Sequence, residues 1–221
     1  VYSYLNIFKD RRGFMNYALT NGSILDGTRQ MQPQKGLSVL VKDGKIVDLV
    51  PDTTDLSNYR VIDLHGHYLL PGLINMHVHL AGNGKPQKKQ RDNEALVKKI
   101  MSNGLTKAIA YRMVCGFAKD ELYSGVTTIR TVGGLGDFDT RLRDDIAAGK
   151  KPGPRILAAN EGISVPGGHM AGSVAVAAKN NEEALAHLAQ AEKEKVDLVK
   201  LMITGGVLDA KEKGVPGELK M

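Results

Sequence analysis

Two histidines stand one residue apart in the stretch PGLINMHVHL, which runs from Pro71 to Leu80. A β-strand places residues i and i+2 on the same face, so we expect the side chains of His77 and His79 to project side by side. Two imidazoles on one face can bind a metal ion together. They can equally be two polar residues on the solvated face of a sheet, so the pair alone leaves both interpretations open.

Lys200, in the stretch VDLVKLMI, is a second residue that could do chemistry. The neighbouring residues predict a strand that is apolar, and therefore buried, on both faces. A buried ammonium is costly unless it is paired, neutralised or modified, and a lysine that has reacted with carbon dioxide becomes a carbamate able to bridge two metal ions. The alternative is a lysine whose ammonium reaches solvent from the end of the strand. The face of Lys200 also holds Val196, Leu198 and Met202, and the opposite face holds Val199, Leu201 and Ile203.

Short strands and turns dominate the chain from Asn16 to about Leu70. The stretch LSVLVKDGKIVDLVP has Asp-Gly turn chemistry between two alternating runs, which predicts a hairpin. We expect residues 15–70 to form part of a small β-sandwich domain. Residues 1–14 do not share the pattern, which begins at Met15, so we expect them to be a non-native leader.

Strands alternate with helices after Gly72. The expected helices cover about 93–123, the stretch DFDTRLRDDIAAG ending at Gly149, and the stretch NEEALAHLAQAEKEK. Strand–helix units in series predict a parallel sheet and an α/β fold, either a small open sheet or a barrel. Four such units are half of a (β/α)8 barrel, a fold that needs ~250 residues. We expect residues 71–221 to hold the first four βα units. The expected strands are LINMHVHL, GVTTIRTVG, PRILAAN and VDLVKLMITGG.

Composition excludes several classes of protein. Cys115 is the only cysteine, so no internal disulfide can form, which favours a reducing compartment. No apolar run approaches the ~18 residues of a membrane span, and no signal peptide is evident. The net charge is +6, but the densest basic run, KPQKKQR, has no aromatic residue for base stacking. We therefore expect a cytoplasmic protein that binds neither membrane nor nucleic acid. A basic α/β module that binds nucleic acid is the more distant alternative.

Four stretches resemble the amidohydrolase superfamily in their order and spacing. The similarity covers nearly all of the chain from Tyr17 onward, and it is greatest to the branch of imidazolonepropionase-like enzymes and Xaa-Pro dipeptidases. It implies a metal-dependent hydrolase in which a metal-activated water cleaves a C–N bond of a small amide, cyclic amide or dipeptide substrate. The stretches are VIDLHGHYLLPGLINMHVHL, GVTTIRTVGG, GPRILAANEGISVPGGHM and VDLVKLMITGG.

The resemblance also implies roles for individual residues. His77 and His79 would bind the more buried metal, and a carbamylated Lys200 would bridge two metal ions. His169 would face the substrate. Zinc is the first expectation for both ions, with manganese or iron as alternatives. Thr131 departs from the family, because many relatives have Asp at that position.

The remaining histidines have simpler interpretations. We expect His65 and His67, in the stretch HGH, to be turn and surface residues, because they precede the strand rather than follow it. We expect His187 to be a surface or packing residue of a helix.

The family's later metal ligands and its catalytic Asp would lie beyond residue 221. We therefore expect an N-terminal fragment that is inactive alone, and a homo-oligomer or a complementing C-terminal half is the expected protein partner. The alternative is a non-catalytic truncated or split-subunit protein that needs a partner chain.

Overall fold

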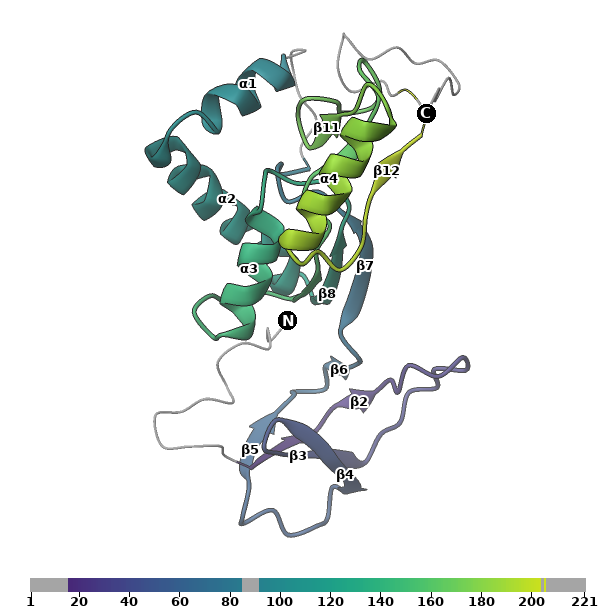
Figure 1. Cartoon of the computed structure of the whole chain (residues 1–221). Helices are drawn as coiled ribbons and strands as arrows, with labels where there is room; N and C mark the ends of the chain where they lie inside the picture. Colours follow the sequence, from purple (N-terminus) through teal and green to yellow (C-terminus); the bar gives the residue numbers. More distant parts are fainter. Residues whose placement is uncertain (1–15, 85–91, 204, 206–221) are drawn as a thin grey trace. The chain divides into compact units, whose positions relative to one another are not determined.

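The computed structural model describes residues 16–84, 92–203 and 205. The chain divides into two compact units between Gly72 and Leu73 (Figure 1). The expectation for residues 1–14 lies outside the described residues. None of the described helices combines the length and the apolar character needed to cross a lipid bilayer.

The first unit contains a four-stranded mixed sheet in the order β4-β3-β1-β5. Strands β3 and β4 pair antiparallel, with Lys42 opposite Lys45, and the predicted hairpin is confirmed. Asp43 and Gly44 form its turn at φ angles of 51° and 74°, a conformation that suits Asp-Gly. β1 pairs antiparallel with β3 and parallel with β5. The strands are β1 (Tyr17–Thr20), β3 (Leu37–Lys42), β4 (Lys45–Pro51) and β5 (Arg60–Asp63).

A second, parallel pair of strands lies in the same unit. It joins β2 (Ser23–Ile24) to β6 (Tyr68–Leu69). The buried core of the unit draws on both sheets, because Ile24 of β2 packs with residues of β1 and β3. That core consists of Tyr17, Ile24, Val39 and Val41.

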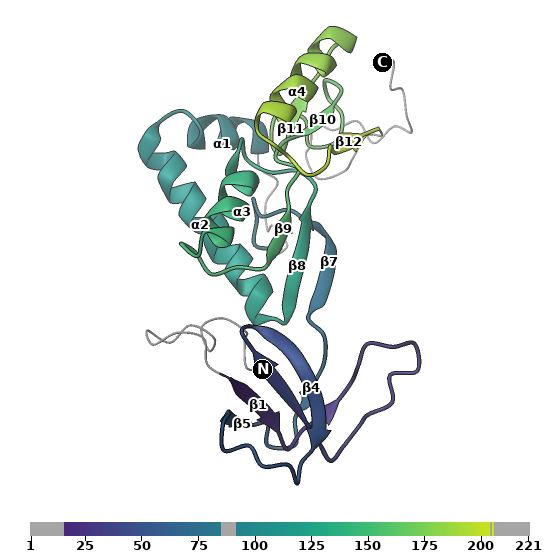
Figure 2. The same cartoon turned by 60° about the horizontal axis from the view of Figure 1, so that its bottom comes forward.

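The second unit is built on a three-stranded parallel sheet in the order β7-β8-β9. The strands are β7 (Leu73–Val78), β8 (Val126–Thr131) and β9 (Arg155–Leu157). Helix α2 (Gly104–Tyr123) contacts β8, and helix α3 (Phe138–Ala147) contacts β9. Figure 2 shows the three strands side by side with these helices next to them. The parallel sheet with its connecting helices confirms the predicted α/β class.

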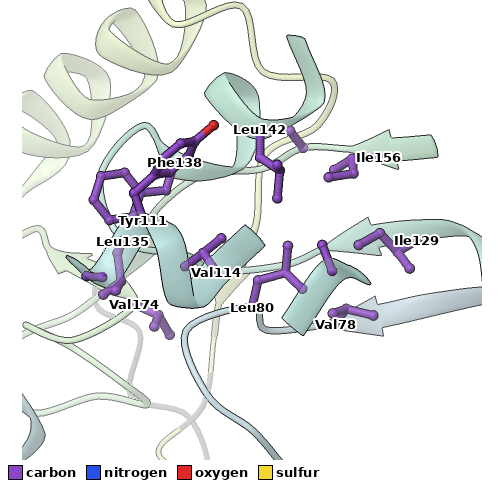
Figure 3. Close-up of a cluster of buried hydrophobic side chains, with 13 residues drawn as sticks. Val78, Leu80, Tyr111, Val114, Ile129, Leu135, Phe138, Leu142, Ile156 and Val174 are labelled. Atoms are coloured by element: carbon purple, nitrogen blue, oxygen red, sulfur yellow. The ribbon is translucent and has the colours of Figure 1, made fainter. Parts of the chain in front are cut away.

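The core of the second unit lies between the sheet and these two helices (Figure 3). Ile129 of β8 and Leu142 of α3 are fully buried in it. Burial of such side chains stabilises the fold by about 1.5–3 kcal/mol each. The labelled members are Val78, Leu80, Tyr111, Val114, Ile129, Leu135, Phe138, Leu142, Ile156 and Val174.

A further parallel sheet follows, in the order β11-β10-β12. It contains β10 (Gly162–Ser164), β11 (Ala175–Ala177) and β12 (Leu201–Met202), and α4 (Asn181–Lys193) precedes β12. The predicted third strand, PRILAAN, contains β9, and the structure adds two short strands that were not predicted, β10 and β11. The fourth predicted strand does run beside the third. Its Asp197 N–H donates to the Ala158 carbonyl, and the Ile163 N–H donates to the Lys200 carbonyl.

The single helix predicted over residues 93–123 is instead two helices. Helix α1 (Asn93–Ile100) ends before α2 begins at Gly104. Asn103 is the N-cap of α2, and its side chain accepts a hydrogen bond from the Thr106 N–H at 3.0 Å. Asn favours such a cap over the interior of a helix, and this competition explains the break.

The predicted burial of the Lys200 strand on both faces is wrong. Leu201 and Ile203 are 48% and 56% exposed, because no described element covers them. On the opposite face Met202 is buried and Lys200 is half-buried. The strand that contains Lys200 therefore has apolar residues on both faces, but only the face of Met202 is buried.

Candidate functional site

His77 and His79 lie at the C-terminal end of β7, and the structure brings their side chains together. The two Nε2 atoms are 3.3 Å apart. The ring centroids are 5.2 Å apart, with an angle of 62° between the ring planes. The i, i+2 spacing therefore brings the Nε2 atoms of the two rings next to each other.

The carbonyl of Gly133 fixes the orientation of the His79 ring. Nδ1 of His79 lies 3.0 Å from this oxygen. A carbonyl can only accept a hydrogen bond, so Nδ1 carries the proton and Nε2 keeps its lone pair. A backbone carbonyl on one ring nitrogen is the usual support of a histidine that binds a metal through the other.

Gly133 is suited to this close approach because it lacks a side chain. Its φ angle is +136°, a conformation that L residues rarely adopt. A Cβ atom there would lie 3.1 Å from the Val174 carbonyl oxygen and 3.2 Å from the His79 ring. The glycine therefore allows the strand end and the imidazole to pack directly against each other.

The surroundings of His79 favour its neutral form. Burial lowers the pKa of His79, the hydrogen bond to Gly133 raises it, and the charges of His77, Lys200 and His169 lower it further. The net direction is downward. A neutral imidazole is the form that binds metals. The same influences place Lys200 and His169, both half-buried, within electrostatic range of the histidine pair.

The donor pair fits a tetrahedral metal ion. Two nitrogens bound to zinc at ~2.0–2.1 Å in tetrahedral geometry lie about 3.3 Å apart. The two Nε2 atoms already have this spacing. Among the described residues, no group of three or more His, Cys, Asp or Glu side chains is arranged to hold a metal.

The other histidines occupy the places expected for them. His65 is exposed in the turn between β5 and β6 at a φ angle of 49°. Nδ1 of His67, in the same turn, lies 2.7 Å from the Leu64 carbonyl oxygen. His187 is half-buried on α4.

Thr131 has a structural role that accounts for a hydroxyl at this position. Its side chain is fully buried at the end of β8. Its Oγ1 accepts a hydrogen bond from the Ala159 N–H at 3.1 Å and donates to the Leu157 carbonyl oxygen at 3.4 Å. Thr131 therefore ties β8 to the segment that follows β9.

Sequence reasoning missed Asp139, a buried carboxyl group in the first turn of α3. The residue is 1% exposed, and its Oδ2 has no hydrogen-bond partner among the described residues. Burial raises the pKa of Asp139 to about 6, against smaller opposing effects of Thr131 and the Asn160 N–H. A Cβ atom on Gly134 would lie 2.6 Å from Oδ2, so Asp139 packs against the turn that presents Gly133 to His79. Leu142 lies on the buried side of α3, and Asp139 precedes it by three residues, a spacing that puts both on the same face of the helix. This spacing is the sequence signal that indicates the burial of Asp139.

Comparisons with known proteins identify relatives of this chain. Protein FwdA of Methanocaldococcus jannaschii is 31% identical over 122 residues, which cover 52% of this chain and 20% of that protein. The imidazolonepropionase of Salmonella paratyphi A is 31% identical over 114 residues, which cover 45% of this chain and 28% of that protein. A solved Xaa-Pro dipeptidase with methionine bound in its active site is 28% identical, with a TM-score of 0.71 over 91% of this chain and 50% of that chain.

The chain matches less than a third of the length of these curated relatives and half of the length of the solved dipeptidase. The sequence profile described as "Amidohydrolase family" matches residues 68–215, a range that includes His77, His79, His169 and Lys200. The predicted resemblance is thereby confirmed, and the chain belongs to the amidohydrolase family.

Proposed function

We propose that the chain is the N-terminal part of a metal-dependent hydrolase that cleaves a C–N bond of a small amide, cyclic amide or dipeptide. The observation that carries the proposal is the 3.3 Å separation of the His77 and His79 Nε2 atoms, with the tautomer of His79 set by Gly133. The similarity to an imidazolonepropionase and to an Xaa-Pro dipeptidase supports this class of substrate.

Each residue of the site has a distinct role in this proposal. His77 and His79 would hold a metal ion through Nε2, and Lys200, as a carbamate, would supply a further anionic ligand. Zinc suits these ligands best, and manganese or iron would also fit. The metal, when bound, supplies a Lewis acid and lowers the pKa of a bound water. His169 faces the substrate, while Gly133 keeps the proton of His79 on Nδ1 and away from the metal side.

We further propose that additional strands complete a barrel around this site. The strands β7 and β12 support this, because each exposes large apolar side chains, among them Ile74 at 62% and Leu201 at 48%. Exposed apolar strands are liabilities unless another element pairs with or covers them. The proposed architecture is half of a (β/α)8 barrel with part of a β-sandwich, in a cytoplasmic protein.

The same exposed strands favour the second candidate, a non-catalytic split or truncated protein that folds with a partner chain. The two candidates differ in what His77 and His79 do. In the enzyme the pair binds metal, and in the non-catalytic protein it is two polar residues that share a hydrogen bond.

The test is a hydrolysis assay against Xaa-Pro dipeptides and other small amides. We expect no meaningful turnover from the zinc-loaded chain alone, and turnover that depends on His77 when a polypeptide carrying the later strands is co-expressed with it. Turnover by the chain alone that disappears in His77→Ala would contradict the proposed incompleteness. If zinc binding is unchanged in His77→Ala and His79→Ala, the metal centre is refuted and the non-catalytic candidate stands.

A further inference from the structure

Helix α2 is apolar on two opposite faces. The face toward the sheet buries Ala110, Val114, Ala118 and Leu122. With 100° per residue, Ile109 lies roughly 160° and Met113 roughly 120° around the helix from that face. Both are 54% exposed. Large apolar side chains gathered on an exposed helix face mark a surface that can bind a partner.

The covering partner is not an extension of the sheet. The outer face points away from β8, which α2 contacts with its buried side chains, and Figure 2 shows α3 and the strands on one side of α2. Strands added beside β7 or β12 would lengthen the sheet layer beneath the helices. Such strands alone would not cover the outer face of α2.

Gly116 marks the centre of the outer face. It lies seven residues from both Ile109 and Tyr123, which is two helical turns in each direction. A Cβ atom at Gly116 would meet nothing within 4 Å, so no described neighbour requires a glycine there. Glycine inside a helix costs about 1 kcal/mol relative to alanine. The missing side chain allows another backbone to approach closely at this point.

The charges on this face are self-complementary about Gly116. Arg112 lies four residues before the glycine and Asp120 four residues after it, and both are exposed. Neither side chain forms an ion pair with any residue in the described part of the chain. If two copies of α2 cross antiparallel at Gly116, Arg112 of each copy faces Asp120 of the other, and Ile109 faces Tyr123. The ring of Tyr123 is 46% exposed and available for this contact.

We propose that the outer face of α2 is a homodimer interface, in which two copies of this chain pack α2 against α2 in antiparallel orientation with Gly116 at the two-fold axis. The face holds Ile109, Arg112, Met113, Gly116, Asp120 and Tyr123. A contact between two helices is at the small end of specific interfaces, below ~1,200 Å², so we expect a weak dimer whose population depends on protein concentration.

Analytical ultracentrifugation of the purified chain over a range of concentrations tests the interface. We expect Arg112→Asp and Asp120→Arg each to weaken dimerisation at least tenfold, and the double exchange of both charges to restore it. We expect Gly116→Leu to give a monomer whose thermal stability is unchanged or higher, because leucine favours helix and has space within the chain. Lys98→Glu, on the exposed side of α1, is the matched charge control and should leave the dimer intact.

Cross-linking provides a second readout that needs no purified sample. With Cys115→Ser as background, Gly116→Cys should give a disulfide-linked dimer on a non-reducing gel of cell extract after mild oxidation, because the two positions meet at the axis. Lys98→Cys in the same background should remain monomeric. A monomer at all concentrations, failure of the double exchange to restore association, or equal cross-linking at both cysteine positions would overturn the proposal.

Discussion

Replacement of Asp139 by asparagine should make the protein more stable at neutral pH. The carboxyl group is 1% exposed, and burial raises its pKa from the ordinary value of 3.8 to about 6. A raised carboxyl pKa means that the folded state favours the neutral form. The folded state therefore binds a proton that the unfolded state has released between pH 3.8 and 6, and the free energy of unfolding falls as pH rises through that window.

The size of the effect follows from the pKa difference. A shift of about 2 units, at ~1.4 kcal/mol per unit, corresponds to roughly 3 kcal/mol. This cost is fully present at pH 7 and nearly absent below pH 3.8, where both states are protonated. Asparagine is neutral at every pH and has nearly the same shape. We expect the variant to gain up to ~3 kcal/mol over the wild type at pH 7, and little at pH 3.5.

Urea denaturation of the wild type and Asp139→Asn at pH 3.5, 5, 6 and 7 measures the difference directly. Titrations of other groups are common to both proteins and cancel in the difference between them. Asp137→Asn is the matched control, because it makes the same carboxyl-to-amide change at an exposed position at the start of the same helix. If the difference for Asp139→Asn is the same at pH 3.5 and pH 7, or if the variant is less stable at pH 7, the buried carboxyl does not titrate as we infer.

Two further predictions use matched pairs of sites. Gly133→Ala should lower zinc affinity at least tenfold, because the added Cβ would lie 3.2 Å from the His79 ring, whereas Gly149→Ala, also at positive φ but with open space around it, should leave zinc affinity unchanged. A chelator-competition titration distinguishes the two, and equal losses would show that His79 does not depend on Gly133. Leu142→Ala, at a fully buried position, should lower the free energy of unfolding by about 2–5 kcal/mol, and Leu105→Ala, at a position 73% exposed, by less than ~0.5 kcal/mol. Urea denaturation at one pH compares this pair, and similar values would contradict the burial pattern.

The sequence predicted those elements that are determined by a few neighbouring residues: a turn, the end of a helix and the side-chain alternation of a strand. The turn at Asp43-Gly44 favours one hairpin geometry, so β3 and β4 could be read from a few residues. Helix α3 ends where predicted because Gly149 adopts a φ angle of 70°. The pairing of His77 with His79 follows from the two-residue period of a strand, which holds wherever a strand forms.

Features that depend on tertiary contacts could not be predicted in this way. The apolar pattern around Lys200 is the same whether one or two faces are covered, so the exposure of Leu201 could not be read from it. The break before α2 depends on a capping choice of Asn103, which competes with continuation of a long periodic pattern. Asp139 is buried against sequence expectation because its helix packs on the Gly133-Gly134 turn, a contact between separate elements.

The metal centre at His77 and His79 is the central claim, and zinc-edge X-ray absorption on the zinc-loaded protein tests it most directly. The spectrum reports the number of imidazole ligands and their bond lengths, independently of any substrate. We predict two imidazoles at ~2.0–2.1 Å in the wild type, and one in His77→Ala and in His79→Ala, while His187→Ala keeps two. A zinc ion bound without imidazole, or a spectrum that is the same in all four proteins, would contradict the claim.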